Sequence, residues 1–264
     1  MRTLSIFLAA TLCLSAAAIS LPQDANTKAK SIVDSYHALA EAGDMDGLVE
    51  LWKANEYKTL SLIDQDLEGS LSIWESAPDA PSSPDAIAAL HKRALFGARA
   101  ASSAFHRPIF LDYASSFCSW NDAEKRNFRA GQAAFGKTRG AFSKGDFEAA
   151  QAASEECTNL ALPLGDWWGC AMGLGGSGNA KMGMGDFSGA LSDLSRARLI
   201  NNGLGLRGSE LGNLQGMLTC LTELGHTPRA ITVCEELIAA TDGEQNADLV
   251  EQLATLKGKP ALLN

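Results

Sequence analysis

The chain has 264 residues, 46% of them hydrophobic, and a formal net charge of −9 at pH 7. This acidic balance, without any cluster of lysine and arginine, argues against nucleic acid and anionic membrane surfaces as partners. The length allows one long domain or two short ones with an ample core.

Residues 1–20 are predicted to be a secretory signal peptide rather than part of the fold. Arg2 gives a positive start, an apolar run follows from Leu4 to Ala18, and small residues lead up to Ser20. The run is shorter than the roughly 18 to 20 apolar residues needed to span a bilayer. We therefore expect an exported protein, periplasmic or extracellular, with no membrane insertion once the signal is removed.

Residues 21–83 are predicted to form an N-terminal helical cap region. Gly43 and Asp44 have the pattern of a turn between two helices, and apolar residues recur at helical spacing on both sides. We interpret residues 24–56 as a divergent capping hairpin.

Residues 64–75, DQDLEGSLSIWE, allow two interpretations. Carboxylates at the first, third, fifth and twelfth positions and a glycine at the sixth resemble a calcium-binding EF-hand loop. The candidate calcium ligands are Asp64, Asp66, Glu68 and Glu75.

The apolar residues of the same stretch favour a helix instead. They are spaced three or four apart, which marks one continuous helical stripe; they are Leu60, Ile63, Leu67, Leu71 and Trp74. A calcium loop cannot be helical over its first nine residues, because its carboxylates must converge on one point. We therefore expect a helix, with calcium binding as the alternative.

Residues 84–120 are predicted to be connecting helices. A break rich in proline and serine, residues 77–84, precedes a helix that runs to about Phe105 and stops before Pro108. Asn121, followed by Glu124, has the pattern of a capped helix start, and that helix is expected to run to Ser143.

The C-terminal half contains a repeat with a period of forty residues. The glycines of three turns, Gly145, Gly185 and Gly225, lie forty apart, and so do three alanines that follow them. A second landmark has the same period, because LGDWWG at Leu164 corresponds to LGLRG at Leu204. A fixed period of this size indicates a solenoid, in which each unit buries its apolar face on its neighbours.

The residue types indicate that each unit is a pair of antiparallel helices. A glycine before aspartate or phenylalanine ends one helix and allows a tight turn into the next. We therefore predict an all-α fold, a helix-hairpin solenoid over residues 121–241 with a divergent helical N-terminal part. Residues 242–264 are expected to form a C-terminal capping helix and tail.

The middle unit, residues 162–200, resembles a tetratricopeptide repeat (TPR) of the forty-residue kind found in kinesin light chains and Pins-type adaptors. Gly178 matches the family's small residue in the first helix, Gly185-Asp186-Phe187 its turn, and Ala190 its second-helix alanine. The flanking copies match less well. The resemblance covers less than half of the chain and specifies a fold far better than a function.

The resemblance implies a concave groove lined by the first helix of each pair. It implies a protein or peptide partner there, with Asn179 hydrogen-bonding the backbone of a bound peptide. The residues expected to face the groove are Phe135, Arg139, Phe142, Asn179, Met182, Gln215, Thr219 and Thr222. Such a mixture of aromatic, thioether and amide groups suits an extended peptide or a partner helix. For Phe135 and Phe142, packing on the preceding helices is the alternative.

No catalytic motif is present, so we expect a non-enzyme without a cofactor. The four histidines do not belong to a recognisable nucleophile motif, and zinc-protease and serine-hydrolase signatures are absent. The glycine-dense stretch 173–185 lacks the lysine and the preceding strand of a phosphate-binding loop. Close packing of helices explains these glycines better.

Five cysteines follow the predicted signal, and an exported chain meets an oxidising compartment. We predict two disulfides, Cys157 with Cys170 and Cys220 with Cys234, and a free Cys118. Small buried thiols in helices are the alternative.

The sequence thus predicts an exported scaffold that mediates a protein–protein interaction through a helical groove. A calcium-regulated protein that uses residues 64–75 and an exported hydrolase with an unrecognised site are the alternatives.

Overall fold

The computed structural model describes residues 23–76, 84–241 and 246–258, and all regular structure within them is helical. The helices run in chain order as α1 (Gln23–Ala42), α2 (Met45–Ala54), α3 (Glu56–Ser76), α4 (Pro84–Phe105), α5 (Ile109–Ser119), α6 (Asp122–Phe142), α7 (Phe147–Ala161), the 3₁₀ turn η1 (Leu162–Leu164), α8 (Trp167–Gly183), α9 (Phe187–Gly203), α10 (Arg207–Glu223), α11 (Thr227–Ala240) and α12 (Asn246–Gly258).

The signal peptide predicted for residues 1–20 lies outside the described residues, as do most of the break at 77–84 and the tail from 259. Among the helices that the structure does describe, none combines the length and the apolar character needed to cross a membrane.

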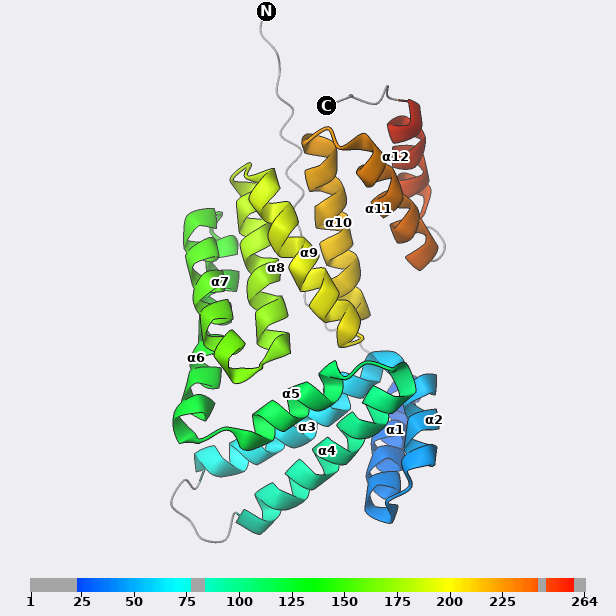
Figure 1. The fold of residues 1–264 in the computed structure, drawn as a ribbon, viewed down its shortest axis with the longest axis vertical. Coiled ribbons are helices and arrows are strands. Elements are labelled where there is room, and N and C mark those ends of the chain that lie inside the picture. Colours follow the sequence, from blue (N-terminus) through cyan, green and yellow to red (C-terminus); the bar gives the residue numbers. More distant parts are fainter. Residues whose placement is uncertain (1–22, 77–83, 242–245, 259–264) are drawn as a thin grey trace, which may run out of the picture.

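Helices α6 to α11 form three successive antiparallel pairs, which we call the array (Figure 1). Each helix packs on the next one along the chain, and α12 packs on α11. The first helices of the pairs also touch one another, α6 with α8 and α8 with α10. The predicted all-α fold built of helix hairpins is therefore confirmed.

The turns of the array share one backbone geometry at intervals of twenty residues. Their glycines have φ between 66° and 82°, a left-handed region that costs glycine little; they are Gly145, Gly165, Gly185, Gly205 and Gly225. The residue after each glycine donates its backbone N–H to the carbonyl five residues earlier, which closes the end of the preceding helix.

Aspartates begin several of the helices. The side chains of Asp44, Asp146, Asp166 and Asp186 accept a backbone N–H three residues later, at 2.8–3.0 Å. The capped start predicted for α6 is confirmed, because Asn121 and Glu124 form a reciprocal capping box.

Helices α1 to α5, which we call the N-terminal block, share one apolar core. Tyr36, Trp52 and Phe110 are among its fully buried side chains. The Trp52 indole N–H donates to the carbonyl of Gly97 at 3.0 Å, which ties α2 to α4. Helices on both sides of residue 83, expected as a cap and as connectors, thus belong to one core.

A buried polar group lies inside this block. Asp66 of α3 is 3% exposed and accepts hydrogen bonds from the Tyr36 hydroxyl at 2.9 Å and from the Arg93 guanidinium at 2.5–3.1 Å. Burial, followed by the charge of Asp66, raises the pKa of Tyr36 far above its usual value. The carboxylate therefore holds α1, α3 and α4 together.

The N-terminal block lies across one end of the array (Figure 1). The two array turns at that end, residues 162–166 and 203–206, are called the lower turns here. Their leucines, Leu164 and Leu204, are 5% and 0% exposed because they enter the core of the block. The Trp120 indole N–H also donates to the carbonyl of Leu164, at 2.9 Å.

Neither predicted disulfide is formed, since the five described cysteines are free thiols. The Cys157 thiol contacts the carbonyl of Gly169 at 3.6 Å, and the Cys234 thiol contacts that of Leu249 in α12 at 3.3 Å. Burial raises the pKa of Cys157 to about 11, so this thiol stays protonated. The alternative interpretation, in which the cysteines are small buried thiols in helices, therefore fits Cys157 and Cys234.

Candidate functional site

The packing of α8 against its neighbours determines which of its residues are left free to bind a partner. Ser177 donates to Asp193 of α9 at 2.8 Å, and a β-carbon on Gly176 would meet Ser154 of α7. Those two sides are therefore used within the array. Gly175 faces α10, where the nearest atom to an added β-carbon is the Asn213 side-chain oxygen at 3.6 Å. Asn179 and Met182 follow Gly175 by four and seven residues and share its side of the helix.

Three first helices carry equivalent residues forty apart on this side, and we call this surface the first-helix face. Arg139 and Asn179 are exposed and Thr219 is half-buried. Within the described chain, Arg139 forms no ion pair and the Asn179 amide has no hydrogen-bond partner. The Thr219 hydroxyl is already bound to the carbonyl of Gln215 at 3.2 Å.

The other predicted contact residues are only partly available. Phe142 is half-buried, with its ring centroid 6.1 Å from that of Phe147 in α7. Met182 packs against the apolar core of α9, α10 and α11. Phe142 thus packs on the helix that follows it, not on a preceding helix as the alternative held. Phe135 is half-buried and Gln215 is exposed.

One polar residue of this region was missed in the sequence. Asn213 of α10 is 7% exposed, and its side-chain nitrogen has no hydrogen-bond partner. A buried donor without an acceptor costs about 1–3 kcal/mol. Its position in the repeat could have identified it. Asn213 follows Gly173 by forty residues, so it places an amide where the preceding repeat has no side chain.

The stretch 64–75 lies within α3, so the helical interpretation is confirmed. Its four carboxylates are divided among several partners and do not converge on one point. Asp64 accepts from Tyr113, Asp66 from Arg93, and Glu68 and Glu75 both bind Arg129. Across residues 23–76, 84–241 and 246–258, no group of His, Cys, Asp and Glu side chains is placed to hold a metal ion. The calcium alternative gains no support from this geometry.

A histidine and a serine that are distant in sequence meet in the block. The ring nitrogen Nε2 of His91 lies 2.9 Å from the Ser70 hydroxyl. Ser70 is only 2% exposed, and its hydroxyl donates to the carbonyl of Leu67 at 2.6 Å. This hydroxyl is therefore engaged in the helix and shielded from substrates.

A shallow hollow of about 240 Å³ lies elsewhere, between α7, α8 and α9. Apolar side chains dominate its lining, including Leu162, which is 53% exposed, and Leu199, which is 71% exposed. None of the residues predicted to bind a partner lines it.

No protein-family model matches the chain, and a search of curated proteins finds no match. Among solved structures, the chain is similar to the TPR2AB domain of yeast Sti1 in complex with pHSP90, with 12% identity, a TM-score of 0.40, and coverage of 88% of this chain and 97% of that chain.

Proposed function

We propose that this protein is a non-enzymatic binding module that holds an extended peptide or a helix of a protein partner on the first-helix face. The main support is that Arg139 and Asn179 occupy equivalent positions on the first helices of neighbouring pairs. Both side chains are exposed, and neither has a partner in the described chain. A guanidinium can donate hydrogen bonds to the carbonyl oxygens or the carboxylates of a peptide. A neighbouring amide can donate to its carbonyl oxygens and accept from its N–H groups.

The unpaired amide nitrogen of Asn213 supports this proposal. The side-chain oxygen of the same amide lies 3.6 Å from where a β-carbon on Gly175 would stand, so the amide borders this face. Because this nitrogen is buried, a ligand carbonyl would reach it only after a local rearrangement of the face, which would remove the cost of the unpaired donor.

Site-specific photo-crosslinking in the producing cell tests the proposal. A benzophenone side chain replaces Asn179 or, as the matched control, Ser192, which is exposed on the second helix α9. We expect a discrete protein adduct from position 179 and none from position 192. Adding Arg139→Ala should reduce the adduct at least fivefold while the helical circular dichroism stays unchanged. Equal adducts at both positions, or an adduct insensitive to Arg139→Ala, would exclude the face.

The proposal includes export, supported by the apolar run after Arg2. Intact-mass analysis of the protein from the extracytoplasmic fraction should give a chain that begins after Ala18 or Ser20. Recovery of the whole chain with Met1 from the cytoplasm would contradict this part alone.

A further inference from the structure

Two carboxyl groups lie on the two sides of the contact between the N-terminal block and the array. Asp64 belongs to α3 of the block, and Asp166 begins α8 in the array. Asp166 is 5% exposed and Asp64 is partly buried. Carboxylates in such places lose most of their hydration, which disfavours the charged form.

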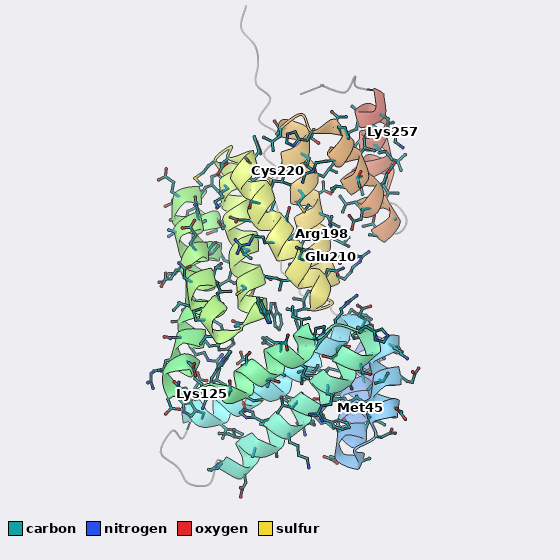
Figure 2. The ribbon with its side chains drawn as sticks, in the orientation of Figure 1. Met45, Lys125, Arg198, Glu210, Cys220 and Lys257 are labelled. Carbon is teal, nitrogen blue, oxygen red and sulfur yellow. The ribbon has the colours of Figure 1, made fainter. Side chains whose placement is uncertain are left out.

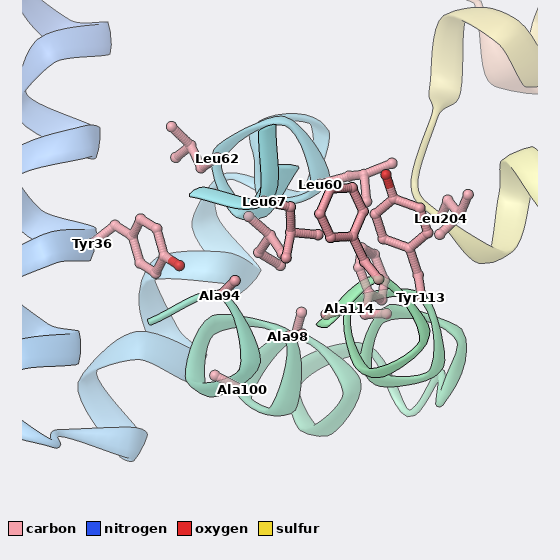
Figure 3. Close-up of a cluster of buried hydrophobic side chains, with 14 of the residues drawn as sticks. Tyr36, Leu60, Leu62, Leu67, Ala94, Ala98, Ala100, Tyr113, Ala114 and Leu204 are labelled. Carbon is pink, nitrogen blue, oxygen red and sulfur yellow. The ribbon is translucent and has the colours of Figure 1, made fainter. Parts of the chain in front are cut away.

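Tyr113 of α5 belongs to the core of the block and is bonded to one of these carboxyl groups. Its hydroxyl donates to Asp64 at 2.6 Å, and the side chain is 1% exposed. Leu204 of the lower turns lies beside Tyr113 (Figure 3). Burial raises the pKa of Tyr113 well above its usual value, and the charges of Asp64 and Asp166 raise it further. The tyrosine therefore remains a neutral donor.

The charges that face this contact are mostly negative. Asp64 faces Glu68 on its own helix and Arg129 from α6, besides Tyr113. Asp166 faces Asp64 and Glu68, and it accepts the Gly169 N–H at 2.8 Å. The guanidinium of Arg129 is already shared between Glu75, at 2.6 Å, and Glu68, at 2.8 Å. The charge of Arg129 lowers the pKa of Asp64, but by less than burial raises it.

The pKa values of both carboxyl groups are shifted towards neutral pH. Burial raises the pKa of Asp64 to about 6, although the hydrogen bond from Tyr113 acts in the opposite direction. Burial raises the pKa of Asp166 to about 7, opposed by its bond to Gly169 and reinforced by the charge of Asp64. When the contact opens, water reaches both groups and their pKa values return towards about 4.

We propose that the contact between the N-terminal block and the array is a proton-controlled joint, held closed when Asp64 and Asp166 are neutral and loosened when they ionise. The closed form binds protons more tightly than the open form, because closing raises both pKa values. Its extra stability is therefore complete in acid and is lost as the pH rises through 6 to 7.

Loosening the joint would also affect the first-helix face. Glu68 accepts a hydrogen bond from Gln132 of α6 at 2.9 Å, and Arg129 of α6 binds Glu75 of the block. Opening would release this end of α6, next to Phe135 and Arg139. This consequence rests on the proposed function, whereas the joint itself does not.

Hydrogen exchange of the full chain, read by mass spectrometry at pH 5.5 and pH 8 and corrected for intrinsic rates, tests the joint without any partner. Residues 109–119 and 164–170 report the contact, and residues 207–240 are the internal reference. From the two pKa values we expect the opening constant of the contact to rise about a hundredfold, with little change in the reference. In the double variant Asp64→Asn with Asp166→Asn, the opening constant should increase by less than about threefold between the same two pH values.

Two single variants keep the test decisive if the double variant does not fold. Asn also caps helices well, so Asp166→Asn should fold and retain only the smaller, Asp64-dependent rise. Asp146→Asn, at the exposed start of α7, is the matched control and should keep the full rise. Opening that is independent of pH in the natural protein, or a full rise in the Asp166→Asn variant, would overturn the proposal. Neither result bears on the crosslinking test of the first-helix face.

Discussion

At Gly178, helices α8 and α9 approach so closely that an added β-carbon would lie 2.7 Å from Cγ of Leu194 and 3.2 Å from the carbonyl oxygen of Ala190. The neighbours must shift to make room, and one of them is backbone. The resemblance to a forty-residue repeat anticipated a small residue here, and the structure supplies the steric reason.

Gly178→Ala should destabilise the protein by about 1–3 kcal/mol, because overpacking a close contact forces local movement. The matched control is Gly140→Ala, at an exposed position in α6 where an added β-carbon meets nothing within 4 Å. That change should be neutral or stabilising by up to about 1 kcal/mol, because alanine favours the helix. Urea denaturation followed by circular dichroism measures both, and equal effects would contradict the packing argument.

The ion pair of Asp66 and Arg93 is a second case at the scale of residues. Their side chains are 4% and 23% exposed. Arg93→Met should cost about 2–4 kcal/mol, because it leaves a buried carboxylate without its cation. The exposed pair Lys137–Glu156, 63% and 48% exposed, is the control, and Lys137→Met should cost less than about 0.5 kcal/mol. A loss for Arg93→Met no greater than for the control would contradict this assignment.

These polar contacts mark the limit of prediction for single residues. Asp66 and Glu68 fit a calcium-loop pattern equally well in sequence, and the apolar stripe alone favoured the helix. The partners Arg93 and Arg129 lie 27 and 61 residues away, a distance that local spacing does not reveal. For the same reason the orphan amide of Asn213 was not found.

At the scale of elements, the turns of the array divide into two kinds. Leu164 and Leu204 precede their glycines and are buried against the N-terminal block, whereas Met184 precedes Gly185 at the opposite end and is 40% exposed. Both kinds have the same positive-φ glycine. The sequence predicted this backbone geometry well, because it depends on a few adjacent residues.

Leu204→Ala should destabilise the protein by about 2–4 kcal/mol, because it removes a fully buried side chain and leaves a cavity beside Tyr113. Met184→Ala, in the corresponding turn at the other end, should change the free energy of unfolding by less than about 0.5 kcal/mol. Denaturant titration gives both values. Hydrogen exchange in α5 should increase for Leu204→Ala alone, and similar losses for the two variants would contradict docking through the lower turns.

Charged contacts also join elements at this scale. Lys125, at the first turn of α6 (Figure 2), has its ammonium 5.1 Å from the centre of the Trp74 ring in α3. Arg198 of α9 is bonded to Glu236 of α11. Such contacts orient neighbouring helices but contribute little individually when exposed.

For the whole molecule, the joint predicts an unusual dependence of stability on pH. The free energy of unfolding should be about 2–3 kcal/mol higher at pH 5.5 than at pH 8, since the raised pKa values of Asp64 and Asp166 favour the folded state in acid. Thermal denaturation at constant ionic strength measures the difference. In the double asparagine variant it should nearly vanish, and persistence there would assign it to other groups.

The arrangement of the whole molecule was the least predictable level. The repeat indicated which helices of the array are neighbours, because consecutive hairpins can stack in only a few ways. Nothing in the N-terminal half indicated that α3, α4 and α5 share a core with α1, or that Trp120 bonds to the turn at Leu164. These contacts join residues far apart in sequence and follow no period.

The regular spacing of the turns has a consequence for how the protein could grow. Among the described turns of the array, those at residues 162–166 and 203–206 are the ones that insert a leucine into the core of the block. A duplicate of residues 186–225 placed directly after Gly225 would begin and end at equivalent points of the backbone and leave that core unchanged. Adding whole helix pairs to the array near its C-terminal end is therefore sterically simple. Adding a helix pair at the end that contacts the N-terminal block is obstructed by α3 and α5.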